Sequence, residues 1–303
     1  MILETERLIL RPWQEEDAEA LYKYASDPQV GPIAGWPPHK NTEESLGVIR
    51  TVFKGRECYA ICLKGDSSPC GCIELKLKGN TDMTSSDTEC ELGYWLGRPF
   101  WHQGIMTEAA EALVRHGFEN LSMEKIWCGY YEGNFRSKGL QKKLGFRFQW
   151  KSENVDVPLM NEKRTGYVSS LTKDEWIWHK MHSAALAVQN DRKLSEYIQA
   201  GSVAAAVLSA SGKIYTGVCV DTSCTLGICA ERNAVFNMIT DGGQEIKKVL
   251  AVMPDGRNGA PCGACRELMV QLMPETYKQI EIMLDYENFR IATLGDITPE
   301  WWI

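Results

Sequence analysis

The sequence predicts an α/β protein of two domains, in which helices pack on mixed β-sheets. Its 303 residues exceed the size that one hydrophobic core usually serves, so two domains are expected. In the second half short apolar strands alternate with helices, which is typical of a sheet covered by helices. In the first half longer strands that look antiparallel follow one another around residues 57–64, 69–78 and 89–96.

The two halves of this pattern meet around residues 179–183. Before them a strand starting at Gly166 leads into a helix, for which Thr172 can serve as the N-cap. No Pro- or Gly-rich spacer separates the halves. We therefore expect domains at residues 1–179 and 182–303 that pack closely or share a helix.

The elements expected after the division are short and regularly spaced. Apolar periodicity and turn residues predict helices over 184–200, 229–239 and 265–272, and strands over 203–208, 214–220, 249–252 and 281–284.

Composition and charge exclude several classes of protein. The formal net charge is −7 with no basic run, which disfavours a nucleic acid polymer as partner. The N-terminus has no secretory pattern, and no apolar run approaches the ~18 residues of a membrane span, so a cytoplasmic protein without membrane contact is expected. Eleven cysteines without a scaffold spacing fit reduced thiols. Six of them are expected to be buried small hydrophobes: Cys58, Cys62, Cys70, Cys72, Cys90 and Cys128.

Three further cysteines lie at the starts of two expected helices. Cys229 opens one helix, and the pair Cys262 and Cys265 opens the next. The first turn of a helix brings such a pair together, so two thiolates can converge on one ion and Cys229 can add a third sulfur. The positive ends of both helices favour thiolate over thiol. Three protein ligands leave the fourth tetrahedral position to water, which predicts a catalytic zinc site.

Two charged residues follow the first of these ligands. Glu231 is held beside the metal without needing to bind it, so it is the expected catalytic residue that takes a proton from zinc-bound water. Three thiolates and Zn²⁺ sum to one negative charge, which would make that water a poor acid. Arg232 can draw off this charge by donating hydrogen bonds to a thiolate. The alternative is a structural zinc site whose fourth sulfur comes from Cys219 or Cys224.

The runs Ile228-Cys-Ala-Glu-Arg-Asn-Ala and Pro261-Cys-Gly-Ala-Cys-Arg-Glu-Leu resemble the cytidine deaminase superfamily in its three-cysteine branch. The resemblance covers residue 184 to the end and implies a three-layer α/β/α domain that binds zinc. It implies hydrolytic loss of the amino group at the carbon corresponding to C4 of cytosine, with Glu231 delivering protons to the ring nitrogen and to ammonia. It further implies a homo-oligomer (dimer or tetramer) and stacking of Trp302 on the base.

One stretch departs from the nucleoside-specific members of that family. They carry Asn-x-Glu in the strand before the zinc helix to hold the ribose hydroxyls, whereas this chain has Cys219 and Asp221 there. A buried hydroxyl that loses its partner costs affinity, so ordinary cytidine is not the expected substrate. The stretch is closer to blasticidin S deaminases, which favours a nucleoside-like small molecule such as a nucleoside antibiotic.

In the first half a strand, a glycine loop and a helix follow one another from Glu91 onwards. The free N–H groups and the dipole of a helix N-terminus suit a pyrophosphate. With Glu4-Thr-Glu-Arg-Leu-Ile-Leu-Arg-Pro-Trp and Asn134-Phe-Arg-Ser-Lys, this loop resembles GNAT acetyltransferases of the ribosomal-protein (RimJ/RimL-like) branch over about residues 1–178. The resemblance implies a mixed β-sheet with flanking helices, acetyl-CoA, an amine acceptor for acetylation, and Glu91 as the base. The implied cofactor-binding residues are His102, Gln103, Gly104, Ile105, Met106, Thr107 and Asn134.

Two positions depart from the GNAT pattern. Met106 stands where the loop usually ends in a small residue, and Gln141 stands where many members carry a tyrosine that acts as general acid. The sequence therefore predicts a bifunctional enzyme, an acetyltransferase followed by a deaminase. A non-catalytic acyl-CoA-binding module that regulates the deaminase is the alternative for the first half, and a binding protein with structural zinc is the alternative for the whole chain.

Overall fold

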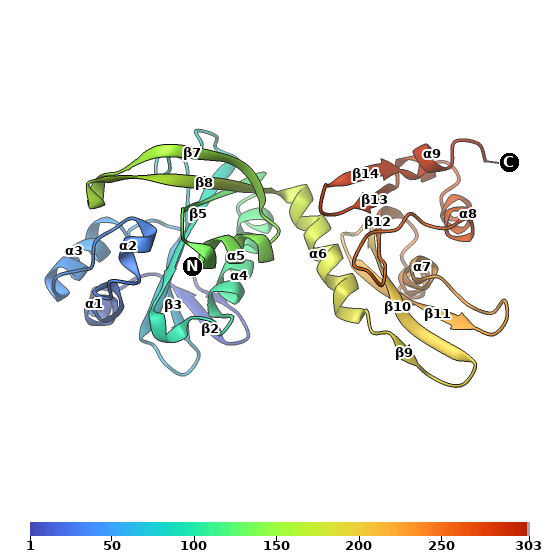
Figure 1. The fold of residues 1–303 in the computed structure, drawn as a ribbon, viewed down its shortest axis with the longest axis horizontal. Helices are drawn as coiled ribbons and strands as arrows, with labels where there is room; N and C mark the ends of the chain where they lie inside the picture. Colours follow the sequence, from blue (N-terminus) through green and yellow to red (C-terminus); the bar gives the residue numbers. More distant parts are fainter. Residues whose placement is uncertain (302–303) are drawn as a thin grey trace. The chain divides into compact units, whose positions relative to one another are not determined.

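The computed structural model describes residues 1–301 and divides the chain into two compact units, one from Met1 to Trp176 and one beginning at Ile177 (Figure 1). The helix α6 (Lys173–Val188) runs through the division. Each unit has its own sheet and its own hydrophobic core.

The first unit is built on an eight-stranded sheet in the order β1-β2-β3-β4-β5-β6-β8-β7. The strands are β1 (Leu3–Glu4), β2 (Leu8–Arg11), β3 (Cys58–Leu63), β4 (Pro69–Lys76), β5 (Glu89–Leu96), β6 (Lys125–Tyr131), β7 (Arg147–Val157) and β8 (Glu162–Thr172). The helices are α1 (Ala18–Ala25), α2 (Gly31–Ala34), α3 (Thr42–Thr51), α4 (Ile105–Glu119) and α5 (Phe135–Lys143). The predicted strands around 57–64, 69–78 and 89–96 are confirmed as β3, β4 and β5.

Helices cover both faces of this sheet. On one face Leu21 of α1 and Ile49 of α3 pack with Cys58 and Cys72 of the sheet. On the other face α4 lies so close that a Cβ at Gly117 would come within 3.1–3.2 Å of Ile126 and Leu75 side chains. The six cysteines predicted to be buried are all buried and free, which confirms that interpretation.

The strands β5 and β6 are the parallel pair of this sheet, and they pair only over a short distance. Their register runs from Glu89 opposite Lys125 to Glu91 opposite Trp127, and β5 then continues to Leu96 without β6 as a partner. Backbone groups of β5 beyond Glu91 are therefore left without ladder partners on that side, which is where a ligand can approach.

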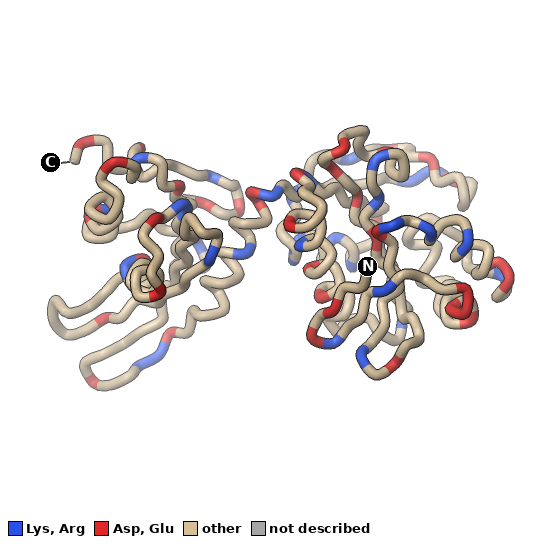
Figure 2. Tube along the Cα trace, turned by 180° about the vertical axis from the view of Figure 1, so that it is seen from behind, with Lys and Arg blue, Asp and Glu red and all other residues tan. Residues whose placement is uncertain are grey.

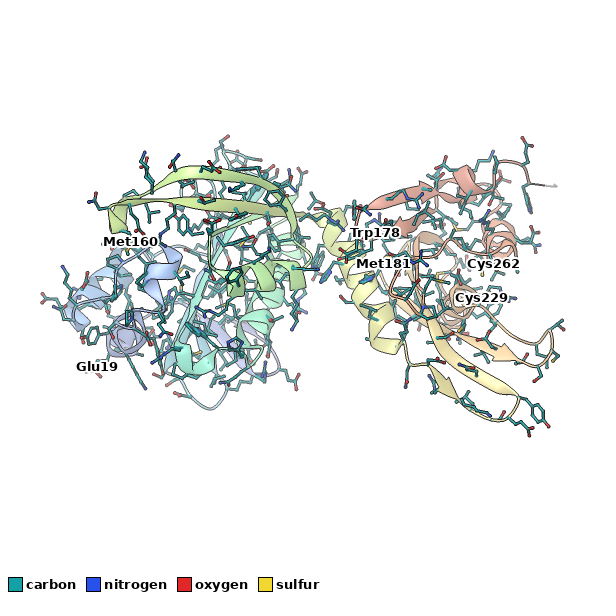
Figure 3. All side chains as sticks on the ribbon, in the orientation of Figure 1. Glu19, Met160, Trp178, Met181, Cys229 and Cys262 are labelled. Atoms are coloured by element: carbon teal, nitrogen blue, oxygen red, sulfur yellow. The ribbon has the colours of Figure 1, made fainter. Side chains whose placement is uncertain are left out.

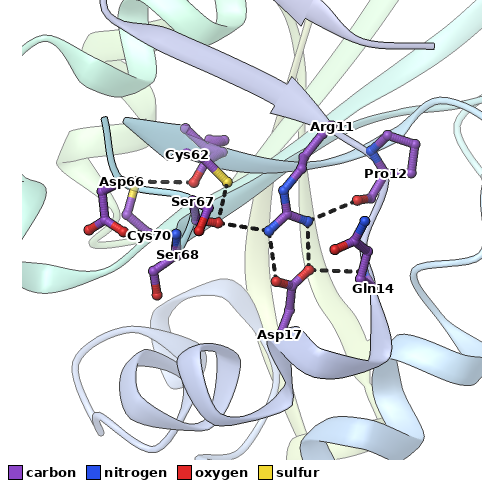
Figure 4. Close-up of polar contacts among 10 residues, drawn as sticks. Arg11, Pro12, Gln14, Asp17, Cys62, Asp66, Ser67, Ser68 and Cys70 are labelled. Carbon is purple, nitrogen blue, oxygen red and sulfur yellow. Dashed lines mark hydrogen bonds and ion pairs between the residues drawn. The ribbon is translucent and has the colours of Figure 1, made fainter. Parts of the chain in front are cut away.

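Arg11 joins three segments of the first unit (Figure 4). Its guanidinium makes two hydrogen bonds of 2.7 Å to the carboxylate of Asp17, and it also donates to the carbonyl oxygens of Ser67 (2.8 Å) and Pro12 (3.1 Å). The side chain of Asp17 is only 7% exposed. Arg11 therefore fixes the start of α1 and the β3–β4 turn to the edge of the sheet.

We expect Arg11→Met to lower the free energy of unfolding of the first unit by about 2–4 kcal/mol, because it leaves a buried carboxylate without its partner. Calorimetry of the full chain measures the change. The matched control is Arg50→Met, which breaks an ion pair with Glu15 in which both side chains are more than half exposed, and which should change stability little. Equal effects of the two substitutions would contradict the role given to Arg11.

The second unit is built on a six-stranded sheet in which β11, β10, β12, β13 and β14 follow one another and β9 also pairs with β10. The strands are β9 (Arg192–Lys193), β10 (Ile198–Ser209), β11 (Ile214–Thr222), β12 (Ile246–Val252), β13 (Glu281–Asp285) and β14 (Arg290–Thr293). Besides α6, the helices are α7 (Ala230–Thr240), α8 (Gly263–Leu272) and α9 (Leu294–Ile297). Three-residue 3-10 turns in the two units lie at Glu15–Asp17, Arg98–Phe100, Pro158–Met160 and Tyr277–Gln279.

Side chains along β10 point alternately to the two faces of this sheet, and helices pack on both faces. Trp178 and Met181 of α6 pack with Ala204 and Ala206 on one face (Figures 1 and 3). Val207 points to the other face and packs with residues of α7 and α8. The unit therefore has the predicted three-layer α/β/α arrangement.

The helix predicted over 184–200 is wrong. The helix α6 continues through the segment expected to divide the halves and ends at Val188, and β9 and the start of β10 form a hairpin over 192–200. Trp178, Met181 and Ala185 are spaced by three and four residues, so the buried stripe of α6 crosses the expected break.

The capping prediction for α6 is confirmed, since the backbone N–H of Glu175 donates to the hydroxyl of Thr172 (3.2 Å).

The other strands and helices predicted for this unit are present, with bounds shifted by a few residues. The short pairing of β14 with β13 was not predicted. Lysine and arginine are interspersed with aspartate and glutamate along both units (Figure 2). In the described part of the chain, none of the helices combines the length and the apolar character that crossing a membrane requires.

Candidate active sites

The three predicted zinc ligands converge at the N-termini of two helices in the second unit. Two of them, Cys229 and Cys262, are labelled in Figure 3. Cys229 is the N-cap of α7 and Cys262 the N-cap of α8, while Cys265 lies in the first turn of α8. The Sγ atoms of Cys229 and Cys262 are 3.5 Å apart, and those of Cys262 and Cys265 are also 3.5 Å apart. All three sulfurs lie within 4.8 Å of one another.

This donor set fits a zinc ion. Sulfurs bound tetrahedrally at the usual Zn–S distance lie about 3.8 Å from one another, close to the separations found here. Burial, with help from the nearby carboxylate of Glu231, raises the pKa of Cys265. Partial burial would also raise the pKa of Cys262, but hydrogen bonds from the backbone N–H groups of Cys265 and Ala264 and from neighbouring thiols lower it. A coordinating thiol loses its proton to the field of a bound cation, so these sulfurs can all bind as thiolates.

Glu231 lies against this cluster. It is in the first turn of α7, its side chain is buried, and it accepts a hydrogen bond from the thiol of Cys265. Burial raises the pKa of Glu231, although hydrogen bonds from its own backbone N–H and from Cys265 act in the opposite direction. A carboxyl group that is shielded from water beside a metal site is suited to proton transfer.

Arg232 occupies the position that the charge argument requires. Its guanidinium donates to the carbonyl oxygen of Gly227 (3.5 Å). Desolvation would lower the pKa of Arg232, but interactions with the sulfurs of Cys229 and Cys265 raise it. The side chain is half-buried, as expected of a residue that compensates the charge of the sulfurs.

The helix that carries Glu231 is held tightly on β11. A Cβ at Gly217 would lie 2.4 Å from the backbone nitrogen of Ala234 and 2.7 Å from the carbonyl oxygen of Ala230, so only glycine permits this approach. Asn233 donates from its side chain to the carbonyl of Val218 (2.9 Å), which fixes α7 along the strand.

A fourth sulfur does not join the cluster among residues 1–301. Cys224 is exposed and lies outside the group of three. The sulfur of Cys219 accepts a hydrogen bond from the backbone N–H of Val203 (3.3 Å) and lies 3.6 Å from Oδ2 of Asp221. The two residues at the positions where the resemblance implies contacts to a sugar thus contact each other.

The end of the chain is tied to the second zinc motif. Arg266 donates to the carbonyl oxygens of Pro261 (2.8 Å) and Ile297 (2.6 Å), and Trp301 donates to Glu267 (2.9 Å). Trp302, the residue expected to stack on the base, lies outside the described residues.

The expected anion-binding loop of the first unit lies between β5 and α4. Gly104 is the N-cap of α4 with a φ of 76°, a left-handed conformation that glycine adopts without strain. Arg7 fastens the loop by donating to the carbonyl of Gln103 (3.0 Å) and to Glu108 (2.6 Å). The free N–H groups at the N-terminus of α4 are therefore held in a fixed position, where they can bind an anion.

A cavity of about 500 Å³ opens at this loop. Six of the seven predicted cofactor-binding residues line it: His102, Gly104, Ile105, Met106, Thr107 and Asn134. Gln103 is not among the lining residues, and its side chain donates to the carbonyl of Pro99 (2.7 Å) instead. Arg136 and Lys143 of α5 add positive charge to the wall, which suits the phosphates of acetyl-CoA.

The far end of this cavity holds a group of hydroxyls that sequence reasoning missed. The hydroxyl of Tyr94 lies 2.7 Å from that of Ser137, and Gln141 donates from its amide to Ser137 (3.3 Å). Burial raises the pKa of Tyr94 well above its usual range. Tyr94 and Ser137 line both this cavity and a second, larger one. They are 43 residues apart, and neither belongs to the loop motif, so no local signal indicated that they would meet.

Glu91, the predicted base, lies in the larger cavity of the first unit. It is 8% exposed. One of its carboxylate oxygens accepts a hydrogen bond from Lys76 (2.9 Å) and the other accepts one from Thr81 (2.6 Å). Its place in a cavity next to Tyr94 and Ser137 fits the predicted role, and its partners hold the carboxylate in one orientation.

Comparisons with known proteins assign a family to each unit. Residues 7–147 match the model of the acetyltransferase (GNAT) domain, and residues 175–279 match that of the cytidine and deoxycytidylate deaminase zinc-binding region. The chain is similar to YnaD of Bacillus subtilis, an uncharacterized N-acetyltransferase, with 26% identity over 179 residues that cover 58% of this chain and 99% of that protein.

A second relative matches the other unit. A cytidine deaminase of Halalkalibacterium halodurans is 35% identical over 77 residues, which cover 25% of this chain and 58% of that protein. The match thus spans a little over half of that deaminase.

Solved structures support the fold of the first unit. A GNAT-family acetyltransferase from Bacillus anthracis covers 57% of this chain and 99% of its own, with a TM-score of 0.51 and 21% identity. A GCN5-related N-acetyltransferase from Brucella melitensis covers 64% and 88%, with a TM-score of 0.53 and 19% identity. Zinc is the metal of the second unit's family and acetyl-CoA the cofactor of the first unit's family. The chain therefore joins a GNAT acetyltransferase domain to a cytidine and deoxycytidylate deaminase zinc-binding domain.

Proposed function

We propose that the chain is a bifunctional enzyme. Residues 1–179 transfer an acetyl group from acetyl-CoA to an amine, and residues 182–303 remove the amino group from a cytosine-type base by hydrolysis. The observation that carries the proposal is the cluster of three cysteine sulfurs at two helix N-termini with Glu231 buried against it. A structural site has no need of a buried carboxyl group beside its ligands.

In the deaminase, Cys229, Cys262 and Cys265 would hold zinc. The ion supplies a Lewis acid that brings the pKa of bound water close to 7. The oxygen of a water molecule would form a bond to the ring carbon that carries the amino group. Glu231 would take one proton of this water and pass it to the ring nitrogen, and would then pass the second proton of the same water to the amino group, which leaves as ammonia when the carbon–nitrogen bond breaks. Arg232 withdraws negative charge from two of the sulfurs, which keeps the site electrophilic.

We propose a nucleoside or nucleoside antibiotic other than plain cytidine as the substrate. Cys219 is 7% exposed, and its sulfur already contacts Val203 and Asp221. A weak thiol partner replaces the amide that would bind a ribose hydroxyl, so a sugar hydroxyl placed there would lose affinity.

In the acetyltransferase, the amine nitrogen forms a bond to the acetyl carbonyl carbon while the carbon–sulfur bond of the thioester breaks. Glu91 receives the amine proton. The hydroxyls of Ser137 and Tyr94 lie where the two cavities meet, so they can return a proton to the departing thiolate. Acetyl-CoA supplies the activated acetyl group.

Ammonia release by the zinc-loaded full chain tests the deaminase half. We expect turnover of blasticidin S to exceed that of cytidine and deoxycytidine. Turnover of cytidine alone would contradict the substrate proposed, while the absence of turnover on all three with zinc bound would contradict the proposed deaminase activity on this class.

Glu91→Gln tests the acetyltransferase half. We expect kcat for release of free CoA in the presence of an amine to fall by about 10²–10⁴-fold with little change in acetyl-CoA binding, because only proton removal is lost. The matched control is Glu89→Gln, on the same strand but outside the cavity lining. Binding of CoA by the wild type without transfer to any amine would instead support a non-catalytic module.

A further inference from the structure

The larger cavity of the first unit measures about 1170 Å³ and lies on the face of the sheet that carries α1 and α3. It shares Tyr94, Asn134 and Ser137 with the cavity at the anion-binding loop. An acceptor in the larger cavity therefore meets an acetyl donor in the smaller one at these residues. Its volume suits a whole small molecule better than the tip of an extended peptide.

The walls of this cavity are strongly aromatic. Eight Phe, Tyr and Trp side chains line it. Trp36 meets Trp95 edge to face with centroids 6.0 Å apart, and Tyr130 stacks on Tyr167 at 5.1 Å with planes only 7° from parallel. Aromatic faces of this kind attract flat rings and cations.

The charged side chains of the lining favour a cation. Four of them are carboxylates: Glu44, Glu74, Asp82 and Glu91. Lys76 is the one Lys or Arg among the described residues of the lining, and its ammonium group is bound to Glu91. Burial lowers the pKa of His39, which disfavours the charged form of the ring. A carboxylate or phosphate on the acceptor would find no free cation here.

Glu74 is a half-buried carboxylate of this wall that has no ion pair within 4 Å among the described residues. It lies on β4 opposite Gly93 of β5, and its Oε1 would be 3.0 Å from a Cβ at that position. Because Gly93 has no side chain, the carboxylate of Glu74 can occupy the space over β5. This space is next to Tyr94, where the two cavities meet. Burial raises the pKa of Glu74, as does Glu91, while Lys76 acts against them. A partly desolvated carboxylate without an ion-pair partner is costly, and an incoming ammonium group would offset that cost.

We propose that the acetyl acceptor is a small molecule with a primary ammonium group on an aromatic or heteroaromatic body, that Glu74 binds this ammonium group, and that acceptors with a free carboxylate or phosphate are excluded. This inference rests on the proposed acetyltransferase activity, because only an acetyltransferase has an acetyl acceptor. Glu74 binds the acceptor, whereas Glu91 remains the proposed base.

Calorimetric titration of the full chain with matched amines tests the proposal without requiring catalysis. Tryptamine and phenethylamine should bind at least about tenfold more tightly than tryptophan and phenylalanine, which add only a carboxylate, and than hexylamine, which lacks the ring. Glu74→Gln should weaken the binding of tryptamine by about tenfold or more. The control Glu43→Gln removes an exposed carboxylate of the same unit that lies outside this lining, and it should change the affinity less than twofold.

Equal binding of tryptamine and tryptophan, an unchanged affinity in Glu74→Gln, or no binding of either aromatic amine at millimolar concentration would each overturn the proposal. Failure of the acetyltransferase function has a different signature. Aromatic amines would then bind as predicted but no CoA would be released. Acetyl transfer to acidic or purely aliphatic amines with equal efficiency would leave the function standing and overturn the inference about the acceptor.

Discussion

Glu231→Gln should slow ammonia release by about 10²–10⁴-fold and leave zinc content and thermal stability close to those of the wild type. The amide is nearly the same size as the carboxyl group, so it fits the buried position in the first turn of α7. It cannot accept the proton that must travel from water to the ring and to ammonia. The three sulfurs proposed to hold zinc are all retained in this variant.

The measurement is the rate of ammonia release from the best substrate, with zinc content determined on the same sample. Glu245→Gln serves as the control, because Glu245 is an exposed glutamate of the same unit outside the metal cluster. A variant that keeps more than about one tenth of the activity would show that another group carries the protons. Loss of both zinc and activity would show that Glu231 maintains the site rather than serving its chemistry.

The parts of the two sites that could be predicted from the sequence are local. Cys262 and Cys265 are separated by one helical turn, and Glu231 follows Cys229 by two positions, so short-range helix geometry nearly determines their approach. The anion-binding loop is equally local, since Gly104 and the start of α4 are neighbours in the chain. The strands β3, β4 and β5 were predictable because each is a short run of mostly buried, mostly apolar residues.

The parts that could not be predicted depend on contacts between distant segments. Tyr94 meets Ser137 only because β5 and β6 separate after Glu91 and α5 begins beside the gap. Glu74 has space over the neighbouring strand because its register partner is Gly93, where a Cβ would lie 3.0 Å from Oε1 of Glu74. Nothing in the residues around Glu74 distinguishes it from an ordinary strand glutamate.

The course of α6 was misjudged for a related reason. Residues 189–200 contain enough helix-compatible residues to extend a helix, but pairing of β9 with β10 determines their structure. Gly201 has a φ of 90°, and a Cβ there would lie 2.0 Å from the carbonyl oxygen of Asn190. This close approach of Gly201 to Asn190 favours the hairpin over a longer helix. It cannot be inferred from the secondary-structure propensities of the residues in this segment.

Cys265→Ser should abolish stable zinc binding and destabilise the second unit. Cys265 is 1% exposed and belongs to the core cluster between α7 and α8 as well as to the group of three sulfurs. Loss of a ligand should weaken zinc binding by more than the roughly 10–100-fold that outer-sphere changes cause. If free zinc exceeds the Kd of the wild type about 1,000-fold, the lost stabilisation is about 4 kcal/mol.

Chelation separates the effect of zinc from that of placing a hydroxyl in the core. A chelator should lower the unfolding temperature of the second unit in the wild type but leave that of Cys265→Ser unchanged, because the variant has no ion to lose. Cys224→Ser, at an exposed thiol outside the cluster, should behave as the wild type in zinc content and in its response to chelator. The proposed three-sulfur zinc site would be contradicted if chelator did not change the unfolding temperature of the wild type. It would also be contradicted if Cys265→Ser still bound one zinc per chain. The charge that Arg232 draws from Cys229 and Cys265 would then need another explanation.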